Sequence, residues 1–275
     1  MRAPRSLVSL VFVLALAACG GGGDEIGDGP AGPADTMFAE AQADLDAGRP
    51  RAAAIGFTEV EQEYPFSEWA RRAMIQAAYA YYTSGDYEES RSAAQRFLEF
   101  YPADPDAAYA RYLIALGYYD QILDVGRDQR DTIDALQALR AVFERHPESE
   151  YARDAQLKFD LALDHLAGKE MEIGRYYLAR SHYTAAIGRF RAVVEEFDTT
   201  SHTEEALHRL VEAYMALGFD EEARRAALIL ATNYPGSEWY ERSFALLQSA
   251  GASQSADDDG TLPTIWRRVI RGEWL

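Results

Sequence analysis

Small and large apolar residues recur at helical spacing along most of the chain. Ala53 and Phe57 lie four residues apart, and Ala186 and Phe190 repeat this spacing further on. Residues three or four apart share one face of an α-helix, so such pairs predict amphipathic helices with one buried side. Runs of β-branched residues are few, and we therefore predict an all-α protein.

A dipeptide marks the ends of these predicted helices at repeating intervals. The copies are Tyr64-Pro65, Tyr101-Pro102, His146-Pro147 and Tyr234-Pro235, with Phe197-Asp198 in the place of another copy. Successive copies are 37, 45, 51 and 37 residues apart, which is typical of a solenoid of helical repeats. Proline ends a helix because it lacks an N–H and clashes with the preceding turn. We predict an all-α solenoid of about five tetratricopeptide-like (TPR-like) helix-turn-helix repeats that form a superhelical rod.

Within each repeat, small residues mark where two helices approach and glycine marks the turn between them. The predicted small and large positions of the first helices are Ala78 and Tyr81, Gly174 and Tyr177, and Val211 and Tyr214; the second helices also include Ala223 and Ala227. The predicted turns contain Gly48, Gly85 and Gly218. We interpret most of the aromatic stripe as core packing.

Two segments explain the longer intervals. Residues 124–131 are mostly charged, which predicts a loop inserted in the third repeat. Residues 151–180 contain no proline, which predicts one long helix or two joined helices.

The amino-terminal residues have the pattern of an export signal. Arg2 and Arg5 precede an apolar run at residues 7–17, which is too short to span a membrane as a mature helix. The run leads into Leu16-Ala17-Ala18-Cys19-Gly20, which resembles the bacterial lipobox. This resemblance implies that Cys19 becomes the lipidated first residue, with an S-diacylglycerol and an N-acyl group, whereas the alternative is an ordinary signal peptide. Gly20, rather than aspartate, suggests sorting to the outer membrane.

These observations divide the chain into five parts. We predict a lipoprotein signal peptide at 1–18, a lipidated amino terminus and flexible tether at 19–35, a TPR-like superhelical domain at 36–250, an acidic linker at 251–260 and a basic amphipathic segment at 261–275. In the last segment Ile265, Trp266, Val269 and Ile270 form one stripe, while Arg267, Arg268 and Arg271 lie on the other side. It could fold back on its own repeats, dock on a partner protein or lie on the membrane surface.

Composition excludes several classes of function. The net charge of −18 disfavours nucleic-acid binding, because the phosphate backbone attracts lysine and arginine. A single cysteine excludes an internal disulfide and cysteine-rich metal sites. No His-Glu-x-x-His or Gly-x-Ser-x-Gly motif occurs. We expect no catalytic residues, no metal site and no cofactor other than the covalent lipid.

Several segments together resemble the BamD family of outer membrane β-barrel assembly lipoproteins. They include Tyr64-Pro65-Phe66-Ser67, Ala78-Tyr79-Ala80-Tyr81-Tyr82, Arg96-Phe97, Arg127-Asp128-Gln129, Gly174-Arg175-Tyr176-Tyr177-Leu178-Ala179-Arg180, Tyr183-Thr184-Ala185-Ala186-Ile187 and Asn233-Tyr234-Pro235-Gly236-Ser237. The resemblance extends from about Thr36 to Leu247. The chain departs from the family pattern at Phe197-Asp198 and His146-Pro147, where Tyr-Pro is usual.

The resemblance implies a non-catalytic role at the periplasmic face of the outer membrane. It implies binding to the BamA-type β-barrel insertase by the carboxy-terminal repeats, together with other BAM lipoproteins, and binding of unfolded outer membrane proteins by the amino-terminal repeats. For the insertase, the candidate residues are Arg189 and Arg180. Arg189 precedes the core residue Phe190, so it is expected to point outward; alternatively it is a surface arginine paired with Glu195 or with nothing.

For the unfolded substrate, we predict a concave peptide groove lined by Tyr79, Tyr82, Tyr87 and Tyr109. Two alternatives remain open for the whole chain. One is a lipid-anchored periplasmic TPR adaptor of cell division or envelope maintenance, and the other is an accessory protein for substrate binding or polysaccharide export.

Overall fold

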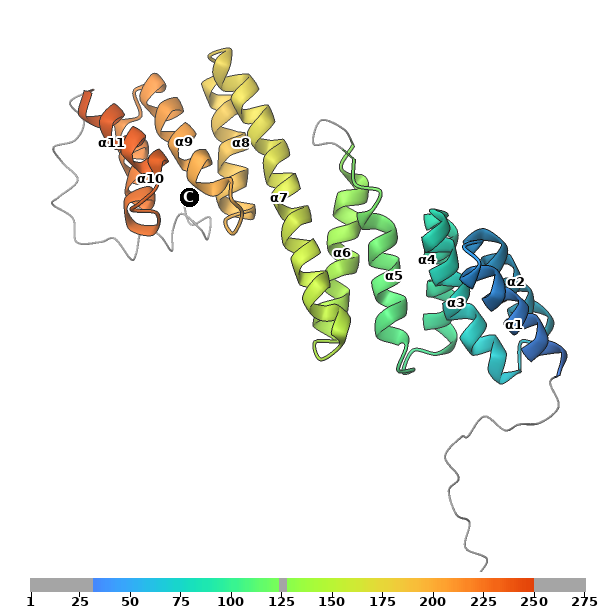
Figure 1. Ribbon diagram of the computed structural model, residues 1–275. Coiled ribbons are helices and arrows are strands. Elements are labelled where there is room, and N and C mark those ends of the chain that lie inside the picture. Colours follow the sequence, from blue (N-terminus) through green and yellow to red (C-terminus); the bar gives the residue numbers. More distant parts are fainter. Residues whose placement is uncertain (1–31, 124–127, 250–275) are drawn as a thin grey trace, which may run out of the picture.

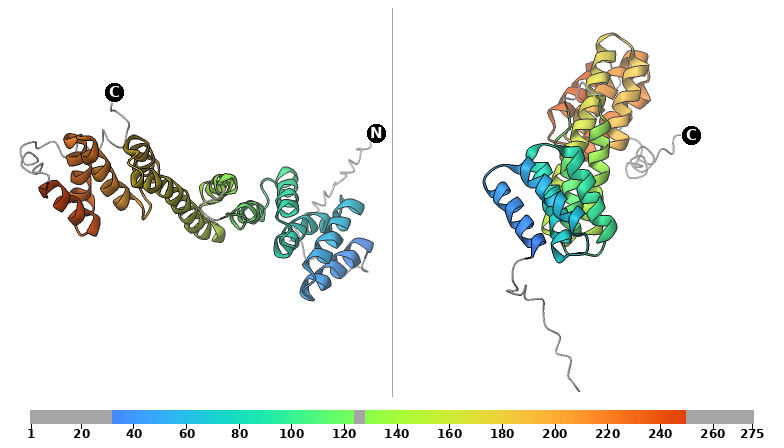
Figure 2. Two further views of the ribbon diagram at one scale, coloured as in Figure 1. Left: turned by 90° about the horizontal axis from the view of Figure 1, so that it is seen from above. Right: turned by 90° about the vertical axis from the view of Figure 1, so that its right-hand side faces the viewer.

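The computed structural model describes residues 32–123 and 128–249, and in these residues every regular element is an α-helix. The helices are α1 (Pro33–Asp46), α2 (Pro50–Glu63), α3 (Glu68–Ser84), α4 (Tyr87–Phe100), α5 (Ala107–Tyr119), α6 (Arg130–Arg145), α7 (Glu150–Ala179), α8 (Tyr183–Glu196), α9 (Thr203–Leu217), α10 (Asp220–Asn233) and α11 (Glu238–Ser249). They stack side by side in chain order into an elongated, twisted rod (Figures 1 and 2). The predicted all-α, TPR-like solenoid is confirmed.

The helices form five antiparallel pairs, from α1–α2 to α9–α10, and α11 follows as an additional helix. Each helix packs against its neighbours in sequence, and first helices of adjacent pairs also touch, as α3 touches α5 and α5 touches α7. These first helices line the inner face of the curve. Helix α11 packs on α9 and α10 and covers the end of the stack.

The buried residues lie at the positions that the helical spacing predicts. Ala53 and Phe57 are fully buried, as are Ala186 and Phe190. Gly174 shows why a small residue is needed, because a Cβ there would lie 2.4 Å from the Phe190 ring. Close approach of α7 and α8 therefore depends on the absence of a side chain at residue 174.

The second helix of each pair ends in the same way, with or without proline. The residue after that helix has a φ between −129° and −133° at Tyr64, Tyr101, His146, Phe197 and Tyr234. A hydroxyl three residues later donates to its carbonyl in several repeats, from Ser67 to Tyr64 and from Thr200 to Phe197, both at 2.8 Å. Phe197-Asp198 therefore ends its helix as the Tyr-Pro copies do, because the Phe197 carbonyl accepts from both the N–H and the hydroxyl of Thr200.

The short turns of the α1–α2, α3–α4, α7–α8 and α9–α10 pairs use the left-handed backbone conformation. Gly48, Gly85 and Gly218 have φ values of 71°, 80° and 76°. Ser181 takes the equivalent place after α7 with a φ of 61°, although it carries a side chain. Only glycine adopts this region without a steric penalty, so the α7–α8 turn is strained.

Two boundaries differ from the sequence-based prediction. Helix α1 begins at Pro33, inside the segment predicted as tether, because proline suits the first turn of a helix. Helix α6 begins at Arg130, so the last two residues of the predicted loop at 124–131 are helical.

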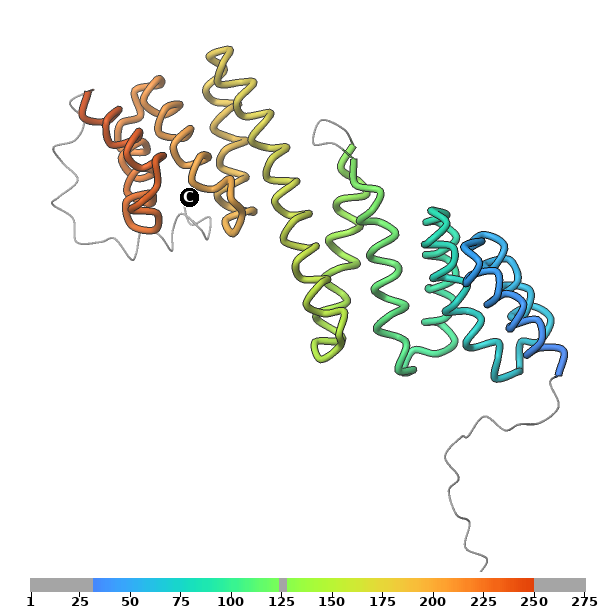
Figure 3. The backbone as a smooth tube through the Cα atoms, in the orientation of Figure 1, coloured from blue at the N-terminus to red at the C-terminus, as the bar shows by residue number. Residues whose placement is uncertain are grey.

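Residues 151–180 lie almost entirely in the single helix α7, which is longer than its neighbours and joins the first three pairs to the last two (Figure 3). The predictions for the signal peptide, Cys19, the acidic linker and residues 261–275 lie outside the described residues.

Candidate functional site

The four predicted groove tyrosines gather on α3, α4 and α5, and we call them the tyrosine face (Tyr79, Tyr82, Tyr87 and Tyr109). Tyr79 is 38% exposed, and the other three are half-buried. The Tyr82 and Tyr87 ring centroids are 5.8 Å apart. Burial, reinforced by the nearby phenols of Tyr79 and Tyr82, raises the pKa of Tyr109. The structure therefore brings the predicted residues together.

One of the half-buried phenols, Tyr82, is fixed by a hydrogen bond to a neighbouring helix pair. The Tyr82 hydroxyl donates to Asp120 Oδ2 at 2.6 Å, and burial together with this hydrogen bond raises the pKa of Tyr82. The hydroxyl therefore remains a protonated donor near neutral pH. Because Tyr82 lies on α3 and Asp120 directly follows α5, the bond also ties two helix pairs together.

Two further tyrosines extend this face and were missed from the sequence. The Tyr109 ring lies 5.2 Å from that of Tyr151, and Tyr112 stacks on Tyr151 at 5.1 Å. The Tyr112 hydroxyl donates a hydrogen bond to Asp154. Burial raises the pKa of Tyr112, and this hydrogen bond raises it further. Tyr112 lies three residues after Tyr109, so helical spacing could have indicated it, whereas Tyr151 comes from the start of α7 and is brought close only by the fold.

The tyrosine face has the chemistry of a binding surface. Phenol rings offer apolar area and a hydroxyl at low conformational cost, which suits recognition of a peptide with aromatic and apolar side chains. Tyr79 provides the most accessible ring of the four. Neighbouring carboxylates, such as Asp120, accept hydrogen bonds from the tyrosines.

In the second half of the rod, Arg189 points outward from α8, as predicted. Its Nη1 lies 3.0 Å from Glu170 Oε2 on α7, and 44% of its side chain is exposed. The pairing with Glu195 considered from the sequence is wrong, because Arg191 occupies that carboxylate at 2.6 Å. Arg189 and Glu195 are six residues apart and therefore point about 120° away from each other around the helix, whereas Arg191 precedes Glu195 by four residues and shares its face.

Arg180 lies at the carboxy-terminal end of α7. Its guanidinium stacks over the Tyr176 ring, 3.6 Å from the centroid, and both residues are exposed. The residues of this second candidate site, Arg180 and Arg189, thus lie on the same helix pair but make separate contacts.

A chain of ion pairs covers the inner side of α7 and α9. Arg175 lies 2.9 Å from Glu205, and Arg209 bridges Glu205 and Glu212 at 3.1 Å and 2.8 Å. Burial by itself would raise the pKa of Glu212. Hydrogen bonds from His208 and Arg209 outweigh this effect and lower that pKa to about 2. His208 is buried and also contacts Ser243 Oγ of α11 at 2.8 Å, so this network connects α9 to the covering helix.

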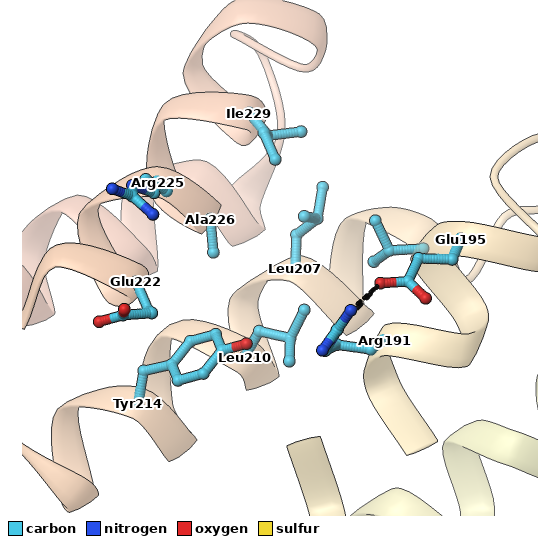
Figure 4. A pocket seen from close by; sticks show the side chains of 10 residues that line it. Arg191, Glu195, Leu207, Leu210, Tyr214, Glu222, Arg225, Ala226 and Ile229 are labelled. Atoms are coloured by element: carbon cyan, nitrogen blue, oxygen red, sulfur yellow. Dashed lines mark hydrogen bonds and ion pairs between the residues drawn. The ribbon is translucent and has the colours of Figure 1, made fainter. Parts of the chain in front are cut away.

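A pocket of about 210 Å³ opens between α8, α9 and α10 (Figure 4). Leu207, Leu210 and Ala226 form its apolar surface, and the Arg191–Glu195 ion pair lies at its edge. Its size and lining suit a single apolar side chain rather than a reacting group.

The described residues hold no group of three or more His, Cys, Asp or Glu side chains arranged for a metal ion. Within the same residues, no helix combines the length and hydropathy needed to cross a bilayer. The candidate residues lie in two regions, the tyrosine face and the α7–α8 surface formed by Arg180 and Arg189.

Comparison with known proteins supports a family assignment. Residues 30–229 match the YfiO family model, described as "Outer membrane lipoprotein". The chain is 48% identical over 219 residues to outer membrane protein assembly factor BamD of Caulobacter vibrioides, covering 80% of this chain and 72% of that protein. It is 38% identical over 243 residues to the protein of the same name from Rickettsia prowazekii, covering 88% of this chain and 97% of that protein.

Among solved structures, a TPR2AB domain complex of yeast Sti1 matches with a TM-score of 0.39 and 16% identity, covering 80% of this chain and 86% of that chain. Because the family model and the relatives span most of the solenoid, the chain belongs to the BamD family of outer membrane lipoproteins.

Proposed function

We propose that this chain is a non-catalytic lipoprotein of the outer membrane β-barrel assembly (BAM) complex. The observation that carries the proposal is the 48% identity over 219 residues to a protein named as an outer membrane protein assembly factor. Lipid on Cys19 would anchor the chain at the periplasmic face of the outer membrane, since two or more acyl chains give stable anchoring. The solenoid would then act as a binding platform.

The α7–α8 surface, with Arg189 and Arg180, is the proposed contact for the BamA-type insertase. Arg189 already pairs with Glu170, so a carboxylate of the partner would share or replace that pairing. Loss of one member of a desolvated, hydrogen-bonded charge pair typically costs about 2–5 kcal/mol of binding free energy. An exposed arginine that stays paired only with Glu170 would contribute less than about 1 kcal/mol.

The tyrosine face is the proposed receptor for unfolded outer membrane proteins. Its rings lie on the inner side of the first three pairs, where an extended peptide could pass over several helices. Hydrogen bonds to Asp120 and Asp154 keep the rings of Tyr82 and of the adjacent Tyr112 in place before a peptide arrives. Such preorganisation lowers the entropic cost of binding.

The experiment that tests the function is purification of the lipidated chain from membranes in mild detergent, followed by mass spectrometry of the recovered proteins. We expect a BamA-type β-barrel in near-stoichiometric amount, with other BAM lipoproteins. Recovery of division or export proteins in its place would contradict the proposal. Mass measurement of the amino-terminal peptide would show whether Cys19 carries the lipid.

Arg189→Gln and Glu170→Gln form a matched pair for the insertase contact. Arg189→Gln should weaken binding to the insertase by about 2–5 kcal/mol without loss of helicity. Glu170→Gln frees the same arginine from its internal partner, so binding should stay unchanged or tighten. Equal dissociation constants for Arg189→Gln and the unaltered chain would remove Arg189 from the interface.

A further inference from the structure

A groove of about 620 Å³ crosses the inner face of the last two helix pairs. It lies between α7, the start of α8, α9 and α11. Its apolar side chains come from four of these elements and are Leu178, Ala179, Tyr183, Met215, Ala216 and Leu246. No comparison or family name assigns an occupant to this hollow.

The charged residues of the groove already have partners within the chain. Arg175 pairs with Glu205, and Arg209 pairs with Glu205 and Glu212. An occupant therefore gains little from these charges and must be recognised mainly by the apolar surface. This condition favours an amphipathic segment whose apolar side chains form one stripe.

The chain itself carries such a segment within reach. Leu246 lines the groove in the last turn of α11, and that helix ends at Ser249, so the chain leaves α11 beside the groove. Residues 250–260 could extend over about 35 Å. The distance from α7 to α11 across α9 is about 20 Å, given helix spacings of 8–10 Å. Residues 261–275 can therefore reach every part of the groove.

We propose that residues 261–275 occupy this groove in the same chain, with the stripe Ile265, Trp266, Val269 and Ile270 on its apolar wall. The segment has three arginines and one glutamate, whereas the whole chain has a net charge of −18. Long-range electrostatic attraction therefore favours its return to its own repeats. The opposite side, with Arg267, Arg268 and Arg271, would face solvent.

Two other sites on the same chain fit this segment less well. The pocket between α8, α9 and α10 has a volume of about 210 Å³, which suits one side chain rather than a stripe of four. The outer side of α11 exposes Phe244 among polar neighbours such as Glu241 and Gln248. Of these three sites in the described residues, the groove is the one that combines the length and the apolar lining that the stripe needs.

With residues 261–275 in the groove, the two halves of the solenoid would differ in how easily a partner peptide can reach their inner faces. A partner peptide could reach the tyrosine face directly, whereas entry into the groove would require residues 261–275 to leave. The segment would compete with such a partner at an effective concentration set by the short connection to α11. This competition is independent of which proteins the chain binds.

The test uses residues 19–275 with Cys19→Ser and ¹³C-labelled methionine methyl groups. Met215 lines the groove, whereas Met171 is fully buried in the core and provides an internal control. The ring current of Trp266 should shift the Met215 methyl signal, and Trp266→Ala or Ile270→Asp should remove that shift without moving Met171. The shift should not depend on protein concentration. An unchanged Met215 signal in both variants, or a shift that grows with concentration, would overturn the proposal.

Disulfide formation in the same cysteine-free background locates the segment independently. Trp266→Cys is combined in turn with Met215→Cys in the groove, Tyr214→Cys in the smaller pocket and Phe244→Cys on α11. Fastest intramolecular bridging to residue 215 is expected. Faster bridging to residue 214 or 244, or only bridges between two chains, would contradict the groove as the binding place. The same reaction is repeated with phosphatidylethanolamine vesicles. If residue 215 bridges without vesicles but not with them, the segment occupies the groove and a membrane displaces it. If residue 215 does not bridge without vesicles either, the proposal is wrong.

Discussion

The two halves of the solenoid share one helix-pair geometry but differ in the chemistry of their inner faces. On α3 and α5 the inner side chains are tyrosines, such as Tyr82 and Tyr109, with hydroxyls or rings held by neighbouring pairs. On α7 and α9 the corresponding side carries ion pairs, including Arg175–Glu205 and Arg209–Glu212. The small residues between helices therefore set the fold, while the inner face is free to vary in chemistry.

The long helix α7 connects these two environments. Its first turns supply Tyr151 and Asp154 to the aromatic half, and its last turns supply Arg175 to the charged half. In a stack of repeats each pair contacts mainly its neighbours, so the two halves need not lose structure together.

The largest effect is expected from emptying the core of either half. Phe97→Ala and Phe190→Ala each remove a fully buried ring and should cost about 3–5 kcal/mol of unfolding free energy. Trp69 packs in the first half and Trp239 in the second, so their fluorescence reports each half separately. Trp266 and Trp274 are replaced by Phe so that only these two probes remain. Phe97→Ala should then lower the urea midpoint seen by Trp69 more than that seen by Trp239, and Phe190→Ala should do the reverse. Identical shifts of both probes in both variants would mean that the rod unfolds as one unit.

Adding a methyl group between α7 and α8 should have the next largest effect. Gly174→Ala places a Cβ against the Phe190 ring, and overpacking of this kind typically costs about 1–3 kcal/mol. Gly188→Ala is the matched control, because no atom lies within 4 Å of a Cβ at that position of α8. The control should stabilise the protein by about 1 kcal/mol through helix propensity. Similar urea midpoints for the two variants would show that the close approach at Gly174 is unimportant.

Acid should destabilise the second half of the rod, because protonation of Glu212 removes its ion pairs. Its pKa of about 2 is below the ordinary value of 4.5, so its ionised form is favoured in the folded state. This stabilisation is complete above pH 4.5 and is lost as the pH falls toward 2. We expect a loss of roughly 1–2 kcal/mol, reduced by solvent screening because about a third of the side chain is exposed. Glu212→Gln should flatten the acid dependence of the Trp239 transition, and an unaltered pH profile in that variant would exclude this carboxylate.

The smallest effect is expected at the strained α7–α8 turn of the second half. Ser181 adopts a φ of 61°, where Gly48, Gly85 and Gly218 stand in the other turns. Ser181→Gly should therefore stabilise the protein by about 1 kcal/mol, measured by thermal unfolding. Gly85→Ser is the reciprocal control in the first half and should destabilise by a similar amount. Destabilisation by Ser181→Gly would indicate that the serine side chain makes a compensating contribution.

The sequence predicted the repeat architecture because each repeat has local signals. Spacings such as Ala53–Phe57 and glycine turns such as Gly85 depend only on residues near one another in the chain. The sequence also indicated the four members of the tyrosine face and the outward direction of Arg189. It did not identify Tyr112 and Tyr151 as members of the same face, because their stacking depends on the packing of α5 against α7.

Local signals in the sequence specify an all-α solenoid of helix pairs with small residues between helices, because helical spacing and turn residues act over a few positions. The packing of the helices, by contrast, pairs Arg189 with Glu170 rather than Glu195 and brings the Phe190 ring against Gly174. It also decided which side chains of α7, α9 and α11 enclose a groove. These contacts join residues 16 or more positions apart, and their partners are selected by the angle and distance between packed helices, which no local pattern specifies.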